Sequence, residues 1–213
     1  MPINQSQQMK LDQGREYRNV VMAVRARSAD EESFVVEGYA TTFNQPYELY
    51  RYGSYSVWEQ VDSHAFDDCD MTDVIMQFDH TGRVYARTRN NTLELKTDSK
   101  GLYIVANLGG TEEGRKLYQE IKSGYVDRMS FGFVVGEDSR TYIEDRDAGT
   151  EKCIRTILKI TKLYDVSAVS MPANDMTSIS ARSFADGVLA KRAEERRREK
   201  EKRLKLTLLL EGI

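Results

Sequence analysis

The chain is poor in cysteine, in proline and in long apolar runs. Its 213 residues include only two cysteines and three prolines, and Cys69 and Cys153 lie far apart in the sequence. So few cysteines exclude a disulfide scaffold and are typical of a protein from a reducing, intracellular setting. No apolar run reaches the roughly 18 residues of a membrane-spanning helix. The polar start, residues 1–18, also lacks the apolar core of a secretory signal peptide.

Histidine is scarce as well, since only His64 and His80 occur. The two histidines and two cysteines do not stand at a metal-ligand spacing, so we expect no zinc site. The sequence predicts no other metal and no cofactor. What remains is a globular protein, long enough to bury a core without disulfides.

Charge divides the chain into an acidic body and a basic tail. Residues 188–213 carry nine Lys or Arg against five Glu, a net charge of +4. The whole chain has a net charge of −3, so residues 1–187 carry −7. The tail contains three acid-first pairs four residues apart, which favour a helix: Glu194/Arg198, Glu199/Arg203 and Glu201/Lys205. A solvated helix and a separate targeting segment both fit this pattern. We expect a partner or a second copy to cover the apolar cluster at 206–210.

The body before this tail is mostly β in pattern. Residues rich in β-branched and aromatic side chains, or alternating apolar with polar, predict strands. They lie at 34–40, 92–97, 102–108, 130–135, 154–160 and 163–169, with 98–101 as a hairpin turn and 136–152 as a polar connection. Thr111 can cap a helix that carries Leu117 and Ile121 and ends at Gly124. A second short helix is expected at 63–71. This order predicts a mainly β fold, a β-barrel with appended helices.

Histidine 80 is the first candidate for chemistry. It stands just after the apolar stretch 74–76 and two residues before Gly82, so it belongs to the end of a strand beside a turn. A histidine there is well placed to act as a base, although an ordinary turn histidine fits the same pattern. His64 lies in a polar segment, and we assign it no role.

Serine 130 and aspartate 165 are the other two candidates. Ser130 opens a predicted strand between large apolar residues, where core or turn packing is the alternative reading. Strand alternation places Leu163, Asp165, Ser167 and Val169 on one face. A carboxylate among apolar neighbours needs a partner, and a histidine N–H would supply one, as in a Ser-His-Asp triad. Asp79 is a weaker third member, because neighbours on an extended segment point to opposite faces.

The order of these motifs resembles that of the prohead serine proteases of tailed phages. The resemblance covers roughly 17–182. It rests on 36–44, Ala65-Phe66 after Glu59, Phe78-Asp79-His80, 92–95 with Gly101-Leu102, 123–126, Met129-Ser130-Phe131-Gly132-Phe133, and Leu163-Tyr164-Asp165-Val166-Ser167-Ala168-Val169 with Pro172-Ala173.

The family resemblance implies a fold and a site. The implied fold is that of the herpesvirus capsid-assembly protease, a closed, mostly antiparallel β-barrel ringed by helices. The implied nucleophile is Ser130 and the implied base is His80. Asp165 takes the third place, where family members commonly have Glu and the herpesvirus enzymes a second histidine. The oxyanion donors stay open between backbone N–H groups and an arginine such as Arg128.

The resemblance also implies a function. The chain is expected to be a serine endopeptidase that matures a viral procapsid. Its expected partners are the major capsid protein with its scaffolding segment and the chain itself as substrate, within the assembling procapsid in the host cytoplasm. We expect a flexible segment at 1–16, a protease domain at 17–185 and a removable helical tail at 186–213. The number of copies stays open, and we expect no membrane contact.

Two other functions compete with this one. The alternative is a non-enzymatic capsid scaffold or adaptor, and the contact of His80 with Ser130 separates the two. Nucleic-acid binding through the tail is disfavoured, because its basic residues are interrupted by Glu and lack aromatic neighbours for base stacking.

Overall fold

The computed structural model describes residues 14–20, 25–26, 33–145, 147–170, 194, 197–198 and 201–203. The elements with bounds among them are strands, one α-helix and one 3-10 helix, and the described tail residues 194, 197–198 and 201–203 are helical. The elements are β1 (Arg15–Val20), β2 (Arg25–Ala26), β3 (Val35–Thr42), β4 (Tyr47–Tyr52), β5 (Tyr55–Val61), β6 (Ile75–Phe78), β7 (Thr81–Arg87), η1 (Thr88–Asn90), β8 (Leu93–Thr97), β9 (Gly101–Asn107), α2 (Glu112–Lys122), β10 (Arg128–Asp145) and β11 (Thr150–Val169).

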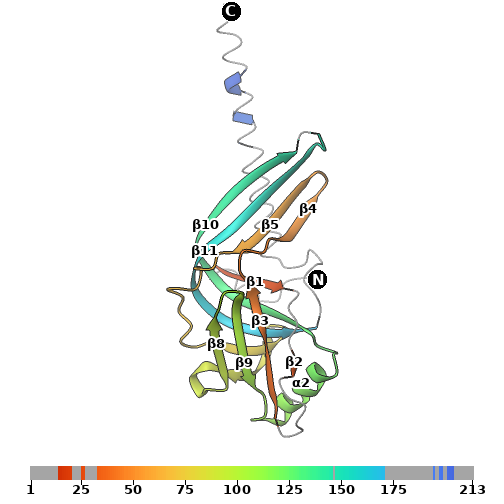
Figure 1. Ribbon diagram of the computed structural model, residues 1–213, viewed down its shortest axis with the longest axis vertical. Helices are drawn as coiled ribbons and strands as arrows, with labels where there is room; N and C mark the ends of the chain where they lie inside the picture. Colours follow the sequence, from red (N-terminus) through yellow and green to blue (C-terminus); the bar gives the residue numbers. More distant parts are fainter. Residues whose placement is uncertain are drawn as a thin grey trace, which may run out of the picture.

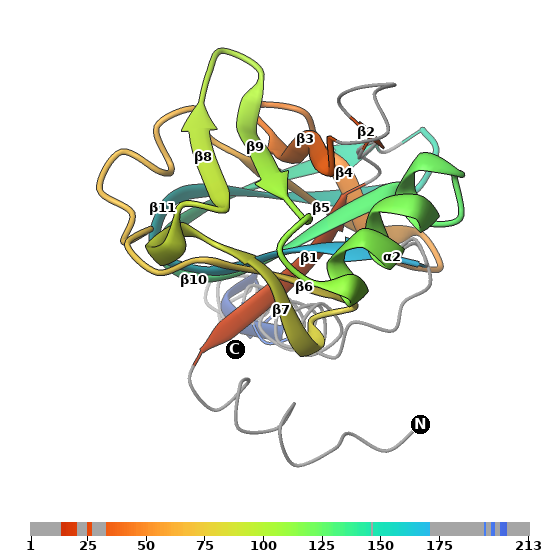
Figure 2. The same cartoon turned by 90° about the horizontal axis from the view of Figure 1, so that it is seen from below.

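The strands form two sheets. The first has seven strands in the order β1-β10-β11-β5-β4, with β6 paired to β11 and β7 to β6, and the second has the order β2-β3-β9-β8. The long hairpin of β10 and β11 curves through the first sheet, and beside it the β4–β5 hairpin runs outward (Figure 1). Seen from below, β3, β8 and β9 lie over one side of this sheet (Figure 2).

The first sheet is an open half-barrel, so the expected closed barrel is wrong. Closure requires the two edge strands of a sheet to pair with each other. Here β1 pairs only with β10 and β4 only with β5, so both keep a free edge within the described residues. Strand β11 pairs in parallel with β5 along its first half and with β6 along its second half. The exchange of partners places β6 beside the end of β11.

Several elements form where the local pattern predicts them. Strand β3 and the antiparallel β8–β9 hairpin are confirmed, and the Asp98 carboxylate closes the hairpin turn by accepting the backbone N–H groups of Lys100 and Gly101 at 2.7 and 3.1 Å. Helix α2 is also confirmed, and so is its expected cap, since the Thr111 hydroxyl accepts the Gly114 N–H at the start of the helix. Cys69 and Cys153 are free thiols.

Two expected elements are wrong. Residues 63–68 form a series of turns in place of a helix, with backbone bonds such as Ala65 N–H to the Asp62 carbonyl, because these turns bury Ala65 and Phe66 in the core. Residues 136–152, expected as a polar connection, are mostly strand. Strand β10 continues to Asp145, and β11 already begins at Thr150. Its polar side chains are those of an exposed hairpin.

The core lies between the two sheets and is closed at one end by α2. Phe131 and Phe133 of β10 stack at 4.5 Å between their ring centroids. They pack with apolar residues of β3, β9, β11 and α2, among them Val36, Ile104, Leu163, Leu117 and Tyr118. Because β10 is anchored in this core, Ser130 has a fixed position near the start of that strand.

The expectations for both ends of the chain fall almost entirely outside the described residues. Strand β1 begins at Arg15, just before the expected domain start, and nothing before residue 14 is described. Of the tail, the structure describes 194, 197–198 and 201–203, in which the Arg198 guanidinium donates to Glu194 at 2.6 Å. None of the helices in the described segments is long and apolar enough to cross a membrane.

Candidate active site

His80 is held in the tight hairpin that joins β6 to β7. Phe78 pairs with Thr81, so Asp79 and His80 form a two-residue loop, and both have positive φ angles of 48° and 55°. Such loops favour Asn and Gly, and other residues in this conformation cost about 1–3 kcal/mol each. The Asp79 carboxylate accepts the backbone N–H and the hydroxyl of Ser170 at 3.0 and 2.9 Å. These bonds fix the strained loop to the end of β11.

Ser130 and Asp165 lie on adjacent strands beside this loop. Ser130 of β10 stands opposite Ser167 of β11, and Asp165 of β11 stands opposite Gly132 of β10. The end of β6 pairs with the same part of β11. Both Ser130 and Asp165 are buried, with 0% and 1% of their surface exposed. Three strands therefore bring the serine, the carboxylate and the histidine loop to one place.

The three side chains that the sequence singled out are in contact. His80 Nε2 lies 2.5 Å from Ser130 Oγ, and His80 Nδ1 is hydrogen-bonded to Asp165 Oδ1. Because a carboxylate can only accept, Nδ1 carries a proton and Nε2 is left to face the serine hydroxyl. The Ser167 hydroxyl also donates to Asp165 Oδ1, at 2.8 Å. This arrangement has the geometry of a Ser-His-Asp site for acyl transfer.

Gly132 provides the space that Asp165 occupies. A Cβ atom at this position would lie 2.4 Å from Asp165 Oδ2 and 2.7 Å from Cε1 of Tyr17. Tyr17, on β1, packs its ring against the imidazole of His80 with 4.6 Å between centroids. The glycine of the Met-Ser-Phe-Gly-Phe motif therefore allows the carboxylate and the tyrosine to approach β10 together.

Substitution of Gly132 by alanine should destabilise the protein. Inserting a methyl group into a filled site costs about 1–3 kcal/mol, because the neighbours must shift. Gly110→Ala is the matched control, since a Cβ there meets no atom within 4 Å. We expect a melting temperature lower by several degrees for Gly132→Ala only. Equal melting temperatures for the two variants would show that Gly132 is not tightly packed.

The remaining predicted residues are elsewhere or differently placed. Asp79 contacts Ser170, as described above, and His64 is exposed with its Nδ1 2.9 Å from Asp67. The Arg128 guanidinium contacts Asp127 at 3.4 Å. The placement of Leu163 on the face of Asp165 is wrong. A bulge on β11 pairs Asp165 with Gly132 but Leu163 with Phe133, so Leu163 faces the core.

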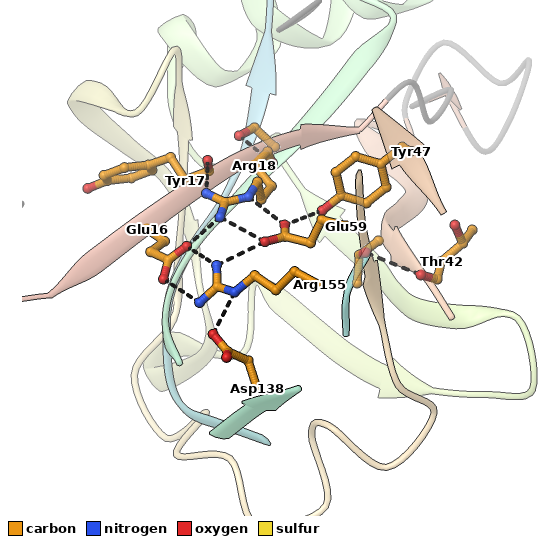
Figure 3. A network of polar contacts seen from close by, with 10 residues as sticks. Glu16, Tyr17, Arg18, Thr42, Tyr47, Glu59, Asp138 and Arg155 are labelled. Carbon is orange, nitrogen blue, oxygen red and sulfur yellow. Dashed lines mark hydrogen bonds and ion pairs between the residues drawn. The ribbon is translucent and has the colours of Figure 1, made fainter. Parts of the chain in front are cut away.

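Beside the three candidates lies a buried ionic network that the sequence did not reveal. The Arg18 guanidinium donates to both carboxylate oxygens of Glu59, at 2.5 and 2.9 Å, and also binds Glu16 (Figure 3). Arg155 reaches Glu59 at 2.9 Å and Glu16 at 2.7 and 3.0 Å. The Tyr47 hydroxyl donates to Glu59 at 2.7 Å. Arg18 lies 41 residues from Glu59, and Arg155 lies 96 residues from it, so no local pattern predicts these contacts.

The network keeps its charges although it is buried. Burial opposes ionisation of Glu16, but the guanidinium groups of Arg18 and Arg155 lower its pKa to about 2. Burial also opposes the charged form of Arg18 and lowers its pKa, but the carboxylates of Glu59 and Glu16 outweigh burial and raise it. Burial and the Glu59 charge raise the pKa of Tyr47 well above its ordinary value, so its hydroxyl stays a donor. Removing one member of such a network typically costs about 3–5 kcal/mol.

The described residues include no group of three or more His, Cys, Asp or Glu side chains that could hold a metal ion. The expectation that the protein uses neither a metal nor a cofactor stays a prediction.

Comparisons with known proteins give two findings. A family model described as caudovirus prohead serine protease matches residues 21–189. The chain is also similar to the prohead protease of Enterobacteria phage HK97, with 32% identity over 95 residues. That alignment spans 44% of this chain and 39% of the relative. No solved structure matches the chain significantly.

Proposed function

The chain belongs to the family of caudovirus prohead serine proteases, and we propose that it is a serine endopeptidase that matures a viral procapsid. The observation that carries this proposal is the contact of His80 with both Ser130 and Asp165. Its proposed substrates are the scaffolding segment of the major capsid protein and the chain itself. Its proposed place of action is the assembling procapsid in the host cytoplasm.

Each of the three residues has one role in the proposed mechanism. Ser130 Oγ attacks the scissile carbonyl while His80 Nε2 takes the hydroxyl proton. His80 then gives this proton to the leaving amine, and water hydrolyses the acyl-serine in a second round of the same steps. Asp165 keeps the imidazole in the required tautomer and stabilises its positive charge. Ser167 positions Asp165 through its hydroxyl.

Cleavage of the capsid protein separates this function from the alternative, a scaffold or adaptor. The cognate capsid protein is expressed with the wild-type chain or with the Ser130→Ala variant, and the intact masses of all products are measured. We expect the wild type to convert the capsid protein into two fragments, and the variant to leave it whole. A capsid protein that keeps its full mass in assembled proheads with the wild-type chain would support the adaptor.

The proposed protease domain is 17–185, and the basic segment 186–213 is the part we expect to be removed. Exposed chain near a terminus is the usual site of proteolysis, and enclosure in a shell raises the effective concentration of each copy. Wild-type protein should therefore lose its end by cleavage between about 183 and 203, whereas Ser130→Ala should keep it. Intact mass spectrometry of both proteins from proheads decides this. Wild-type protein that stays full length in active proheads would contradict self-trimming.

A further inference from the structure

Strand β1 lies across the nucleophile in the way that a bound peptide would. It pairs antiparallel with β10, and Asn19 stands opposite Ser130. The carbonyl oxygen of Arg18 accepts the Ser130 hydroxyl at 2.9 Å. The peptide group between Arg18 and Asn19 therefore lies against Ser130 Oγ through its oxygen, and attack on its carbon requires that oxygen to turn from the hydroxyl towards the oxyanion donors.

The same strand closes the site. Ser130 is 0% exposed and the His80 side chain 15% exposed, with the Tyr17 ring of β1 packed on the imidazole. Strand β1 is also the edge of the first sheet. If β1 leaves, the edge of β10 beside Ser130 becomes free, and an extended peptide can pair there with the same backbone bonds.

The Arg18 side chain fills a pocket built for a guanidinium. Glu59 of β5 accepts it through both oxygens, and Tyr47 of β4 holds that carboxylate from the other side (Figure 3). The exposed fractions are 2% for Arg18 and 0% for Glu59. Two parallel N–H···O bonds to one carboxylate are specific to the planar fork of arginine, and a lysine cannot reproduce them.

A second contact lies two residues earlier on the strand. The Glu16 carboxylate accepts both terminal nitrogens of Arg155, a residue of β11 that also binds Asp138. Glu16 and Arg18 point to the same face of β1, because side chains alternate along a strand. Glu16 and Arg18 of β1 thus each contact a residue of opposite charge on another strand of the first sheet, Arg155 of β11 and Glu59 of β5.

We propose that β1 occupies the substrate groove and that the enzyme cleaves extended peptides after arginine in the pattern Glu-x-Arg. Glu59 recognises the arginine that supplies the scissile carbonyl (P1), and Arg155 recognises the acid two positions before it (P3). The proposal rests on the serine endopeptidase function stated above. In the cleavage step the Ser130 Oγ–carbon bond forms, the carbon–nitrogen bond after arginine breaks, and the serine proton passes through His80 to the new amine. Water then releases the arginine carboxylate.

The pattern recurs in the chain itself. Besides 16–18, Glu-x-Arg occurs at 113–115, 144–146, 194–196, 195–197 and 201–203. The first of these lies in helix α2, where the backbone is already hydrogen-bonded, and Glu144 and Asp145 of the second belong to the paired strand β10. The last three fall in the segment whose removal we expect, so cuts after 196, 197 or 203 follow from the proposed specificity.

The test uses a synthetic peptide with the sequence of residues 12–23, in which Gln13 is the P3 residue of Arg15, and a protein preparation that cleaves the cognate capsid protein. We expect a cut between Arg18 and Asn19 and none after Arg15, which has no acid at P3. In the peptide, Arg18→Gln should lower kcat/KM by about 100-fold or more, because the buried Glu59 carboxylate loses both hydrogen bonds from the guanidinium and keeps only Arg155 and Tyr47 among its described partners. Arg18→Lys should fall between the two, and Glu16→Gln should cost about tenfold.

The pocket is tested from the enzyme side with Glu59→Asp and Glu59→Gln. The preference for the Arg18 peptide over its Gln variant should persist in Glu59→Asp and largely vanish in Glu59→Gln. This ratio is measured within one protein, so it does not depend on the fraction of that variant that folds.

Three outcomes would overturn the proposal. They are equal cleavage of the Arg18 and Gln peptides, Ser130-dependent cuts in the capsid protein that do not follow arginine, and cleavage of the capsid protein but not of the peptide. A preparation with no Ser130-dependent cleavage of any substrate would instead overturn the endopeptidase function, and the specificity with it.

Discussion

Replacing Ser130 by alanine is expected to lower the rate of capsid-protein cleavage by about 10³-fold or more, with the fold intact. Among the described residues, the hydroxyl is hydrogen-bonded to His80 Nε2 and to the Arg18 carbonyl. Its loss removes the nucleophile but little packing, because serine and alanine differ by one oxygen. The stability cost should be about 1 kcal/mol. The measurement is the initial rate of capsid-protein cleavage, together with a thermal melt of each protein.

Ser167→Ala is the matched control for this variant. Ser167 is the cross-strand partner of Ser130 and is equally buried, but its hydroxyl donates to Asp165. We expect a loss of about tenfold or less from this change, since Asp165 keeps its bond to His80. If Ser130→Ala cleaves capsid protein as fast as Ser167→Ala does, Ser130 is not the nucleophile.

Replacing Asp165 by asparagine should lower activity by about 10⁴-fold. An asparagine amide cannot stabilise the imidazolium, and its NH₂ group can turn towards Nδ1 and favour the wrong tautomer. Asp165→Glu should keep measurable activity, because it retains the charge that the family resemblance implies at this place. Cleavage rates of the three proteins on capsid protein give the comparison.

Asp79→Asn provides the control for a change of charge beside the histidine. Asp79 is adjacent to His80 in sequence, but its carboxylate binds Ser170. The asparagine oxygen can still accept one of those bonds, so we expect a far smaller loss than for Asp165→Asn. Near-normal activity of Asp165→Asn with a large loss in Asp79→Asn would move the third role to Asp79.

The sequence predicts those parts of this protein that depend on neighbouring residues. The β8–β9 hairpin follows from the alternation and turn at 92–108, and α2 follows from the cap at Thr111 and the apolar spacing of Leu117 and Ile121. The local pattern indicates all three site candidates, which are a histidine at a strand end, a serine that opens an apolar strand and an acid within an apolar strand. Their order in the chain, which resembles that of a known family, implies their roles.

Other features depend on residues that are distant in sequence. The half-barrel stays open because its edge strands β1 and β4 do not pair with each other within the described residues, and no local pattern indicates this. The change of partner along β11, from β5 to β6, is equally absent from its local pattern. The bulge that turns Leu163 into the core interrupts an alternation that looks regular in the sequence. The contact of Arg18 with Glu59 joins an edge strand at the start of the chain to β5, and only the fold brings them together.

The most direct test of the central claim is covalent labelling of the nucleophile. A fluorophosphonate is added to wild-type protein that cleaves capsid protein in the same buffer, and the adduct is located by peptide mass mapping. We predict one adduct, on Ser130, and none in His80→Ala, where the hydroxyl lacks its base. An active wild-type preparation that carries the adduct on another residue, or takes up no label at all, would contradict the account.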